Sequence, residues 1–248
     1  MRVGPVGVAA EARTAVGARR SLDAAVERSA APVAVNGRSV LPWRDDRRPD
    51  VRFDARFLGR PVLDVARDLL GCRVVSVIDG KRTAGVIVET EAYDGPRDPA
   101  SHAATVSGIT RRNAVMFGPA GYAYVYRIYG MHWCMNVVTG RDGEAQAVLL
   151  RGLDPLEGEG VMTQRRGGRR PLAAGPGRLC QALGVTGELY AHDLTEAPLT
   201  LEPGWDVARE DVGVSGRIGV RAAADWPFRF YVRGAPGVSR HPATARTD

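Results

Sequence analysis

Lysine is almost absent from this sequence of 248 residues. Of its 34 basic residues only Lys81 is a lysine, so the other 33 are arginines. Side-chain amines are therefore scarce, while planar guanidinium groups that suit phosphate oxygens are plentiful. The formal net charge of +6 is mild and gives only weak support to a nucleic-acid partner.

Cysteine and long apolar segments are also scarce. Cys72, Cys134 and Cys180 are widely spaced, with no CxxC pair and no Cys/His cluster at zinc spacing, so we expect three reduced, buried side chains. The longest apolar runs have about six residues, whereas a membrane-spanning helix needs roughly 20. The first 20 residues carry charges where a secretory signal has its apolar region, so we expect a cytoplasmic protein.

Several nucleotide-binding and hydrolase motifs are missing too, including GxGxxG, the P-loop, GxSxG and HExxH. Hydrophobic residues make up 44% and charged residues 25% of the chain, as in ordinary globular proteins and unlike disordered or fibrous ones. The length and composition therefore predict one large domain or two small ones.

Composition divides the chain into a folded region and two tails. Residues 1–50 are rich in alanine and arginine and contain no tyrosine or phenylalanine, so we expect a disordered or loosely helical N-terminal tail. Residues 53–235 contain no repeat and no linker, and they mix helical and strand patterns, which predicts a single α+β domain. Residues 236–248 are predicted to form a C-terminal tail.

Residue periodicity places the elements of this domain. Apolar residues recur at helical spacing over 62–70, and strand patterns on both sides of Asp79-Gly80 predict a hairpin of 72–78 and 81–93. Residues 94–106 are predicted to form a polar loop. Further strands are predicted at 122–129, 132–138 and 145–151, a helix at 176–183, a short helix within 153–165, and a mixture of strands and turns over 199–232.

Two glutamates stand out in the predicted strand 81–93. Glu89, Glu91 and Tyr93 share one face of this strand, because side chains alternate along it. Buried carboxylates are unfavourable unless they are paired or used. Three interpretations are open: exposure at the strand end, activation of a water or nucleophile by one carboxylate, and a glycosidase-like pair, which an i, i+2 spacing of about 6–7 Å would suit.

Aromatic residues and arginines gather elsewhere. Four of the seven tyrosines and Trp133 lie within residues 122–133, where they either pack in the core or stack on bases and wedge a duplex. His102 lies in the polar loop, where a solvated or locally bonded histidine is the simplest interpretation. The arginines of 111–112 and 165–170, and the helix start GPGR at 175–178, either face solvent or bind phosphates.

Taken together, these segments resemble the alkyladenine (3-methyladenine) DNA glycosylases that excise alkylated purines. The resemblance covers residues 53–235. It rests on FLG at 57–59, IVETEAY at 87–93, DPASHA at 98–103, RN at 112–113 with MF at 116–117, YVYRIYGM at 124–131, CMN at 134–136, VLLR at 148–151 with DPLEG at 154–158, GPGRLCQAL at 175–183 and RIG at 217–219. We therefore expect a mostly antiparallel, curved β-sheet with surrounding helices.

The resemblance implies a role for each matching residue. Glu91 is implied to be the general base that deprotonates the attacking water, with Arg151 beside it. Tyr93, His102 and Tyr126 are implied to form the walls of the flipped-base pocket, and Asn136 to crowd the 2-amino group of guanine. Tyr129 is implied to be the wedge that enters the DNA, with Met131 beside it. Phosphate contacts are implied for Arg112, Gly177 and Arg178. Gly177 departs from the family pattern at the phosphate-facing helix start, and this difference affects the details of the contacts there and not the implied activity.

The implied activity is that of a monofunctional DNA glycosylase of base excision repair. Its partner is double-stranded DNA containing damaged purines, and a bacterial-type monomer at the nucleoid, without metal or cofactor, is implied. The lesion is open among 3-methyladenine, 7-methylguanine, hypoxanthine and ethenoadenine, and no general acid for neutral bases is identified. Two alternatives are a duplex-binding protein without catalysis, disfavoured by Glu91, and a carbohydrate hydrolase using Glu89 and Glu91, disfavoured by the basic loops.

Overall fold

The computed structural model describes residues 34–35, 38–39, 48, 50–105 and 108–240. The predicted N-terminal tail over 1–50 lies mostly outside the described residues. Within it, Ala34–Val35 (β1) and Arg38–Ser39 (β2) pair as a small antiparallel ladder. The chain divides into two compact units, Met1–Val40 and Leu41–Asp248, and the elements described below all belong to the second unit.

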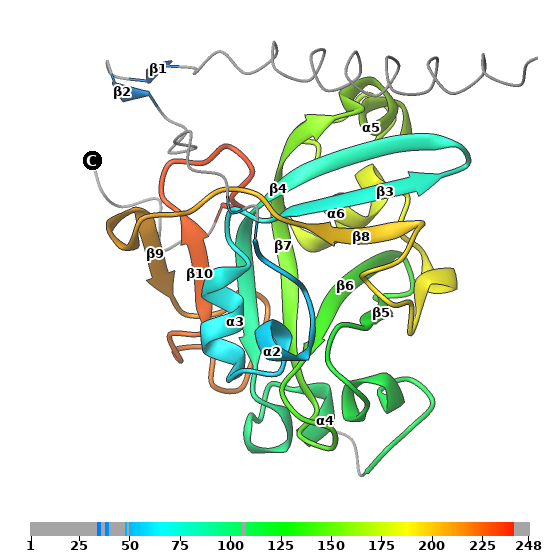
Figure 1. Cartoon of the computed structure of the whole chain (residues 1–248), viewed down its shortest axis with the longest axis vertical. Coiled ribbons are helices and arrows are strands. Elements are labelled where there is room, and N and C mark those ends of the chain that lie inside the picture. Colours follow the sequence, from blue (N-terminus) through cyan, green and yellow to red (C-terminus); the bar gives the residue numbers. More distant parts are fainter. Residues whose placement is uncertain (1–33, 36–37, 40–47, 49, 106–107, 241–248) are drawn as a thin grey trace, which may run out of the picture. The chain divides into compact units, whose positions relative to one another are not determined.

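An eight-stranded sheet forms the frame of this second unit (Figure 1). The strands run in the order β5–β6–β7–β4–β10–β9, and β3 pairs with both β4 and β8. Their bounds are Arg73–Ile78 (β3), Lys81–Tyr93 (β4), Ala123–Ile128 (β5), His132–Thr139 (β6), Gln146–Glu157 (β7), Leu199–Glu202 (β8), Val212–Ser215 (β9) and Arg229–Val232 (β10). The pairs of this sheet are antiparallel, which confirms the predicted class.

Short helices pack on the sheet and at its ends. They are Ala55–Leu58 (α2), Val62–Asp68 (α3), His102–Thr105 (α4), Glu159–Arg165 (α5) and Pro176–Leu183 (α6), with 3-10 turns Gly95–Arg97 (η1), Ala114–Phe117 (η2), Gly187–Leu189 (η3) and Arg209–Asp211 (η4). Helix α3 packs against β4, β7 and β10, and α6 packs against β6 and β7. Thr90 of β4 donates to the Ala66 carbonyl of α3 at 2.8 Å, so it faces this helix.

The boundaries differ from the sequence prediction in two places. Strand β7 continues past residue 151 to Glu157, because its second half pairs with the first half of β4. The predicted polar loop 94–106 is wrong in part, since it contains η1 and the single helical turn α4. Cys72, Cys134 and Cys180 are buried and free, which confirms that prediction.

Both predicted tails contact the domain at their inner ends. The Arg48 amide donates to the Gly204 carbonyl at 2.9 Å. At the other end, the Gly237 amide donates to Oδ1 of Asp154 at 2.6 Å and the Ser239 amide donates to Glu89 at the same distance. The chain after β10 is therefore packed on the sheet at least as far as Ser239, where two buried carboxylates accept its amides.

Candidate active site

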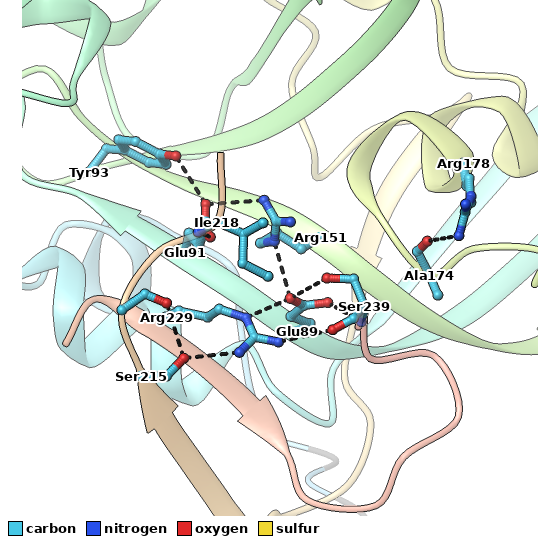
Figure 2. A network of polar contacts seen from close by, with 11 residues as sticks. Glu89, Glu91, Tyr93, Arg151, Ala174, Arg178, Ser215, Ile218, Arg229 and Ser239 are labelled. Carbon is cyan, nitrogen blue, oxygen red and sulfur yellow. Dashed lines mark hydrogen bonds and ion pairs between the residues drawn. The ribbon is translucent and has the colours of Figure 1, made fainter. Parts of the chain in front are cut away.

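Glu91 lies near the end of β4 and has no exposed surface. Because the preceding Thr90 faces α3, strand alternation turns Glu91 to the opposite side of the sheet. Its Oε1 accepts from the Ile218 amide at 2.6 Å, and its Oε2 accepts from the Tyr93 hydroxyl at 3.0 Å and from Nη1 of Arg151 at 3.2 Å (Figure 2). Three donors from three segments of the chain thus hold one buried carboxylate.

The environment of Glu91 favours a base. Burial raises the pKa of Glu91, while Arg151, the Ile218 amide and the Tyr93 hydroxyl act in the opposite direction. Burial, together with the neighbouring Glu91, raises the pKa of Tyr93 well above its ordinary value, so this hydroxyl remains a neutral donor. A carboxylate with a raised pKa accepts a proton from water more readily than an exposed one.

Arg151 joins the two glutamates of β4. Its Nε donates to Glu89 at 3.1 Å and its Nη1 donates to Glu91 at 3.2 Å. The register between β4 and β7 shifts on both sides of Glu89, and Arg151 has no ladder partner there. Such irregular pairing redirects side chains and is common beside active sites. Because all three side chains are buried, the glutamates and the guanidinium form one charge network.

A cavity of about 620 Å³ opens beside this network, a size typical of small-molecule sites. The residues predicted from sequence that line it are Tyr93, His102, Tyr126, Tyr129, Asn136, Arg151 and Gly177. Tyr93, Arg151 and Ile218, the three donors to Glu91, all belong to this lining. Glu91 itself is not among the lining residues, and its carboxylate is in direct contact with three residues that are.

Aromatic rings form a corner of the cavity. The ring centroids of His102 and Tyr126 are 4.6 Å apart with an interplanar angle of 75°. Nδ1 of His102 shares a hydrogen bond of 2.7 Å with the Tyr124 hydroxyl, which ties α4 to β5. Burial lowers the pKa of His102, and Arg112 lowers it further, so the imidazole is neutral at pH 7. This ring can stack on a base but carries no positive charge of its own.

Asn136 lies on β6, opposite Tyr124 of β5. It is 3% exposed, and its Nδ2 donates to the Tyr124 carbonyl at 3.0 Å. The amide is therefore held in one orientation at the cavity wall. This placement is suited to discrimination between purines by shape.

The turn between β5 and β6 projects two apolar side chains. Tyr129 and Gly130 have φ of 52° and 66°, and the Met131 amide donates to the Ile128 carbonyl at 3.1 Å. Two consecutive left-handed residues make a tight hairpin turn, in which glycine is favoured at the second position. Tyr129 is 78% and Met131 68% exposed. Tyr129 reaches the cavity mouth, whereas Met131 is outside the lining.

The three predicted phosphate contacts lie apart from the glutamates. The guanidinium of Arg112 lies 5.1 Å from the ring centroid of Tyr126, and Arg112 is exposed outside the cavity lining. Nη1 of Arg178 donates to the Ala174 carbonyl at 3.1 Å. A Cβ at Gly177 would lie 3.1 Å from the Cβ of His132, so glycine fits the close contact between α6 and β6.

Four further residues complete the site, and sequence reasoning assigned none of them a role. Tyr124 holds His102, and Ile218 holds Glu91. Arg229 and Ser239 bind Glu89, whose two oxygens are thereby occupied away from the cavity. The first two lie within segments that carried the family resemblance, whereas Arg229 and Ser239 had no local signal. The engagement of Glu89 disfavours a carboxyl pair of the glycosidase type.

Within the described residues, no three His, Cys, Asp or Glu side chains group into a possible metal site. In the same part of the chain, no helix has the length and apolar character needed to cross a membrane.

Comparisons with known proteins show the family of this chain. The family model described as "Methylpurine-DNA glycosylase (MPG)" matches residues 56–236. A protein of Carboxydothermus hydrogenoformans named "Putative 3-methyladenine DNA glycosylase" is 48% identical over 75% of this chain and 97% of its own. Proteins of the same name from Methanoculleus marisnigri and Myxococcus xanthus are each 48% identical, over 75% and 77% of this chain and 97% and 94% of theirs. The chain therefore belongs to the methylpurine-DNA glycosylase family.

Proposed function

We propose that this protein is a monofunctional DNA glycosylase that flips an alkylated or deaminated purine out of duplex DNA and hydrolyses its N-glycosidic bond. Family membership supports the excision of alkylated purines in base excision repair. A purine inside a duplex is out of reach, so it must rotate into the cavity at a cost of a few kcal/mol. The cavity beside Glu91 and the exposed turn at its mouth support this step.

In this proposal the β5–β6 turn enters the duplex and the aromatic corner binds the flipped base. Tyr129 enters the duplex and fills the space that the purine leaves, with Met131 beside it. The extruded base lies against Tyr93, His102 and Tyr126, and stacking contributes about 1–3 kcal/mol. A methylated purine carries positive charge, which electron-rich tyrosine faces favour. Asn136 crowds the 2-amino group of guanine.

Hydrolysis then needs a base and a good leaving group. Glu91 accepts a proton from a water molecule, and the water oxygen bonds to C1′ of the sugar as the N-glycosidic bond breaks. The electron pair of that bond leaves with the purine: a cationic purine departs neutral, and a neutral purine departs as an anion that takes up a proton from solvent. Arg151 holds the carboxylate and the water in place. The products are a free base and an abasic site.

The DNA backbone is the proposed partner of the arginine-rich surface. Arg112, the helix start at Gly177 and Arg178 are proposed to contact phosphates on either side of the flipped nucleotide. We propose that the enzyme acts as a monomer on chromosomal DNA in the bacterial cytoplasm.

One observation carries the proposal: a fully buried carboxylate whose three donors line an aromatic cavity. The test is base release from duplexes that contain hypoxanthine or ethenoadenine and from methylated DNA, with a panel of simple glycosides in parallel. The proposal predicts a free purine and an alkali-labile, otherwise intact strand. Lesion binding without base release, or cleavage of glycosides alone, would contradict it.

A further inference from the structure

Glu89 accepts more hydrogen bonds than Glu91, and like Glu91 it is absent from the cavity lining. It has no exposed surface. Its Oε1 accepts from Nε of Arg151 at 3.1 Å and from Nε of Arg229 and Oγ of Ser239, both at 2.7 Å. Its Oε2 accepts from the Ser239 amide at 2.6 Å (Figure 2). A carboxylate with four donors is held in one orientation.

The two donors behind Glu89 are themselves fixed. Arg229 of β10 has no exposed surface, and its remaining nitrogens donate to Oγ of Ser215 at 2.9 Å and to the Ser239 carbonyl at 3.2 Å. The charge of Arg229 is thus directed to Glu89 and away from the cavity. Among the described residues, Arg151 is the one donor to Glu89 that also contacts Glu91.

We propose that Glu89, backed by Arg229 and Ser239, is a positioning residue that holds Arg151 against the general base Glu91. A guanidinium anchored at Nε and at Nη1 has a fixed plane, whereas one anchor leaves it free to turn. Arg151 lines the cavity, so without Glu89 it can rotate toward the space that the DNA occupies. The inference rests on the proposed function, because it assigns Glu89 a part in the same hydrolysis.

Glu89 also acts on Glu91 through charge. The titratable and charged groups around Glu91 are Glu89 and Tyr93 on its own strand, Arg151 on β7, Cys134 on β6, Arg229 on β10 and Arg217 behind the Tyr93 ring. The negative charge of Glu89 raises the pKa of Glu91, and Arg151 lowers it. Replacing Glu89 by glutamine removes that negative charge, and this change lowers the pKa of Glu91.

The test is the pH dependence of single-turnover excision by Glu89→Gln. A general base works deprotonated, so the rate is lost as pH falls through its pKa, and a lowered pKa moves this acid limb to lower pH. We expect that shift together with a roughly tenfold lower plateau, the scale of a slightly misplaced catalytic group. Affinity for the lesion duplex should stay unchanged. If Glu89 only supported folding, Glu89→Gln would lower the reaction amplitude, which measures the fraction of active molecules. The rate constant and the acid limb of its pH profile would then stay as in the wild type.

Asp154→Asn is the matched control. Asp154 is also buried and also binds the C-terminal segment, through the Gly237 amide, but no bond joins it to Arg151 or Glu91 among the described residues. We expect a wild-type rate constant and acid limb for this variant. Equal shifts in both variants would contradict the proposal, since docking of the C-terminal segment would then be the common cause.

Two further variants test the proposal if Glu89→Gln does not fold. Glu89→Gln leaves the buried Arg229 unpaired, so the double variant Glu89→Gln with Arg229→Gln removes both charges. It should show the same slower rate at full amplitude. If it also fails to fold, Ser239→Ala decides: loss of one bond to Glu89 should lower the rate constant at least twofold, and a wild-type rate constant would overturn the proposal.

Glu91→Gln, measured beside these variants, separates the general-base role of Glu91 from the positioning role of Glu89. A wild-type rate for Glu91→Gln would remove the general base, and the proposed mechanism would fail. An inactive Glu91→Gln beside Glu89 variants with wild-type rate constants and limbs would overturn the positioning role alone.

Discussion

Asn136 is the side chain that we propose decides which purines the cavity accepts. Its amide is held at the wall by the Tyr124 carbonyl and cannot turn away without losing that bond. We therefore predict that Asn136→Ser, which is smaller, releases guanine-type bases from DNA roughly tenfold faster, the scale of one pocket contact. Hypoxanthine release serves as the control. If guanine release stays at background while hypoxanthine release survives, discrimination lies elsewhere.

We predict that Asp154→Asn increases the stability of the protein in a pH-dependent way. Burial raises its pKa from 3.8 to about 6, and its Oδ2 has no partner among the described residues. Because the folded pKa exceeds the unfolded one, the stabilising contribution is complete below the unfolded value and is lost as pH rises through about 6. Asp154→Asn stays neutral and keeps an acceptor for the Gly237 amide. We expect a Tm roughly 5 °C above wild type at pH 8.

Thermal unfolding at pH 4 is the control for Asp154→Asn. There the wild-type carboxyl is mostly protonated in the folded protein, so the difference in Tm should nearly vanish. An equal gain at both pH values would show that packing, and not the charge, is responsible.

The candidate site could be predicted from sequence wherever its residues lie in compact motifs. The segment IVETEAY predicted that Glu91 and Tyr93 share a face, and their hydrogen bond confirms it. Arg229 and Ser239 could not be found in this way, because they lie 140 and 150 residues from Glu89. Their approach depends on the pairing of β10 with β4, for which no local pattern exists.

At the scale of the element, the β5–β6 turn is the part of the protein that we propose enters DNA. Its left-handed backbone directs Tyr129 outward. Because a wedge acts in flipping and not in bond breaking, we predict that Tyr129→Ala weakens binding to a lesion duplex and lowers the flipped fraction. The fluorescence of a flipped ethenoadenine measures this fraction. Tyr129→Phe keeps the ring and should keep the signal, and an unchanged signal in Tyr129→Ala would contradict the wedge.

Elements with clear boundaries were predicted most accurately. β4 has its predicted bounds because alternating residues follow a tight Asp-Gly turn, and α6 because a Gly-Pro start and a final glycine limit it. α4 was missed, since a single helical turn after two prolines has too few residues for a periodic pattern. The left-handed Tyr129 was not predicted either, because that conformation is unusual for a tyrosine.

At the scale of the whole molecule, the sheet separates the one lysine from the site. Lys81 is exposed at the start of β4, and Glu91 lies ten residues along the same strand, roughly 30 Å away if extended. No other lysine can form a Schiff base with C1′. We therefore predict that borohydride traps no covalent adduct on lesion duplex and that the strand stays intact until alkali cleaves it.

Lys81→Ala is the control for that experiment and should behave as wild type. An adduct that forms with the wild type and disappears in Lys81→Ala would replace the water mechanism and make Glu91 an accessory residue.

The proposed mechanism depends on Glu91 as the base, and β4, β7 and the Ile218 segment all supply donors to its carboxylate. The most direct test is the single-turnover rate constant of Glu91→Gln on a lesion duplex, with binding measured on the same DNA. We predict retained binding and a rate constant at least about 10²-fold below wild type, the scale of general-base loss. Equal rate constants for Glu91→Gln and wild type would contradict the account.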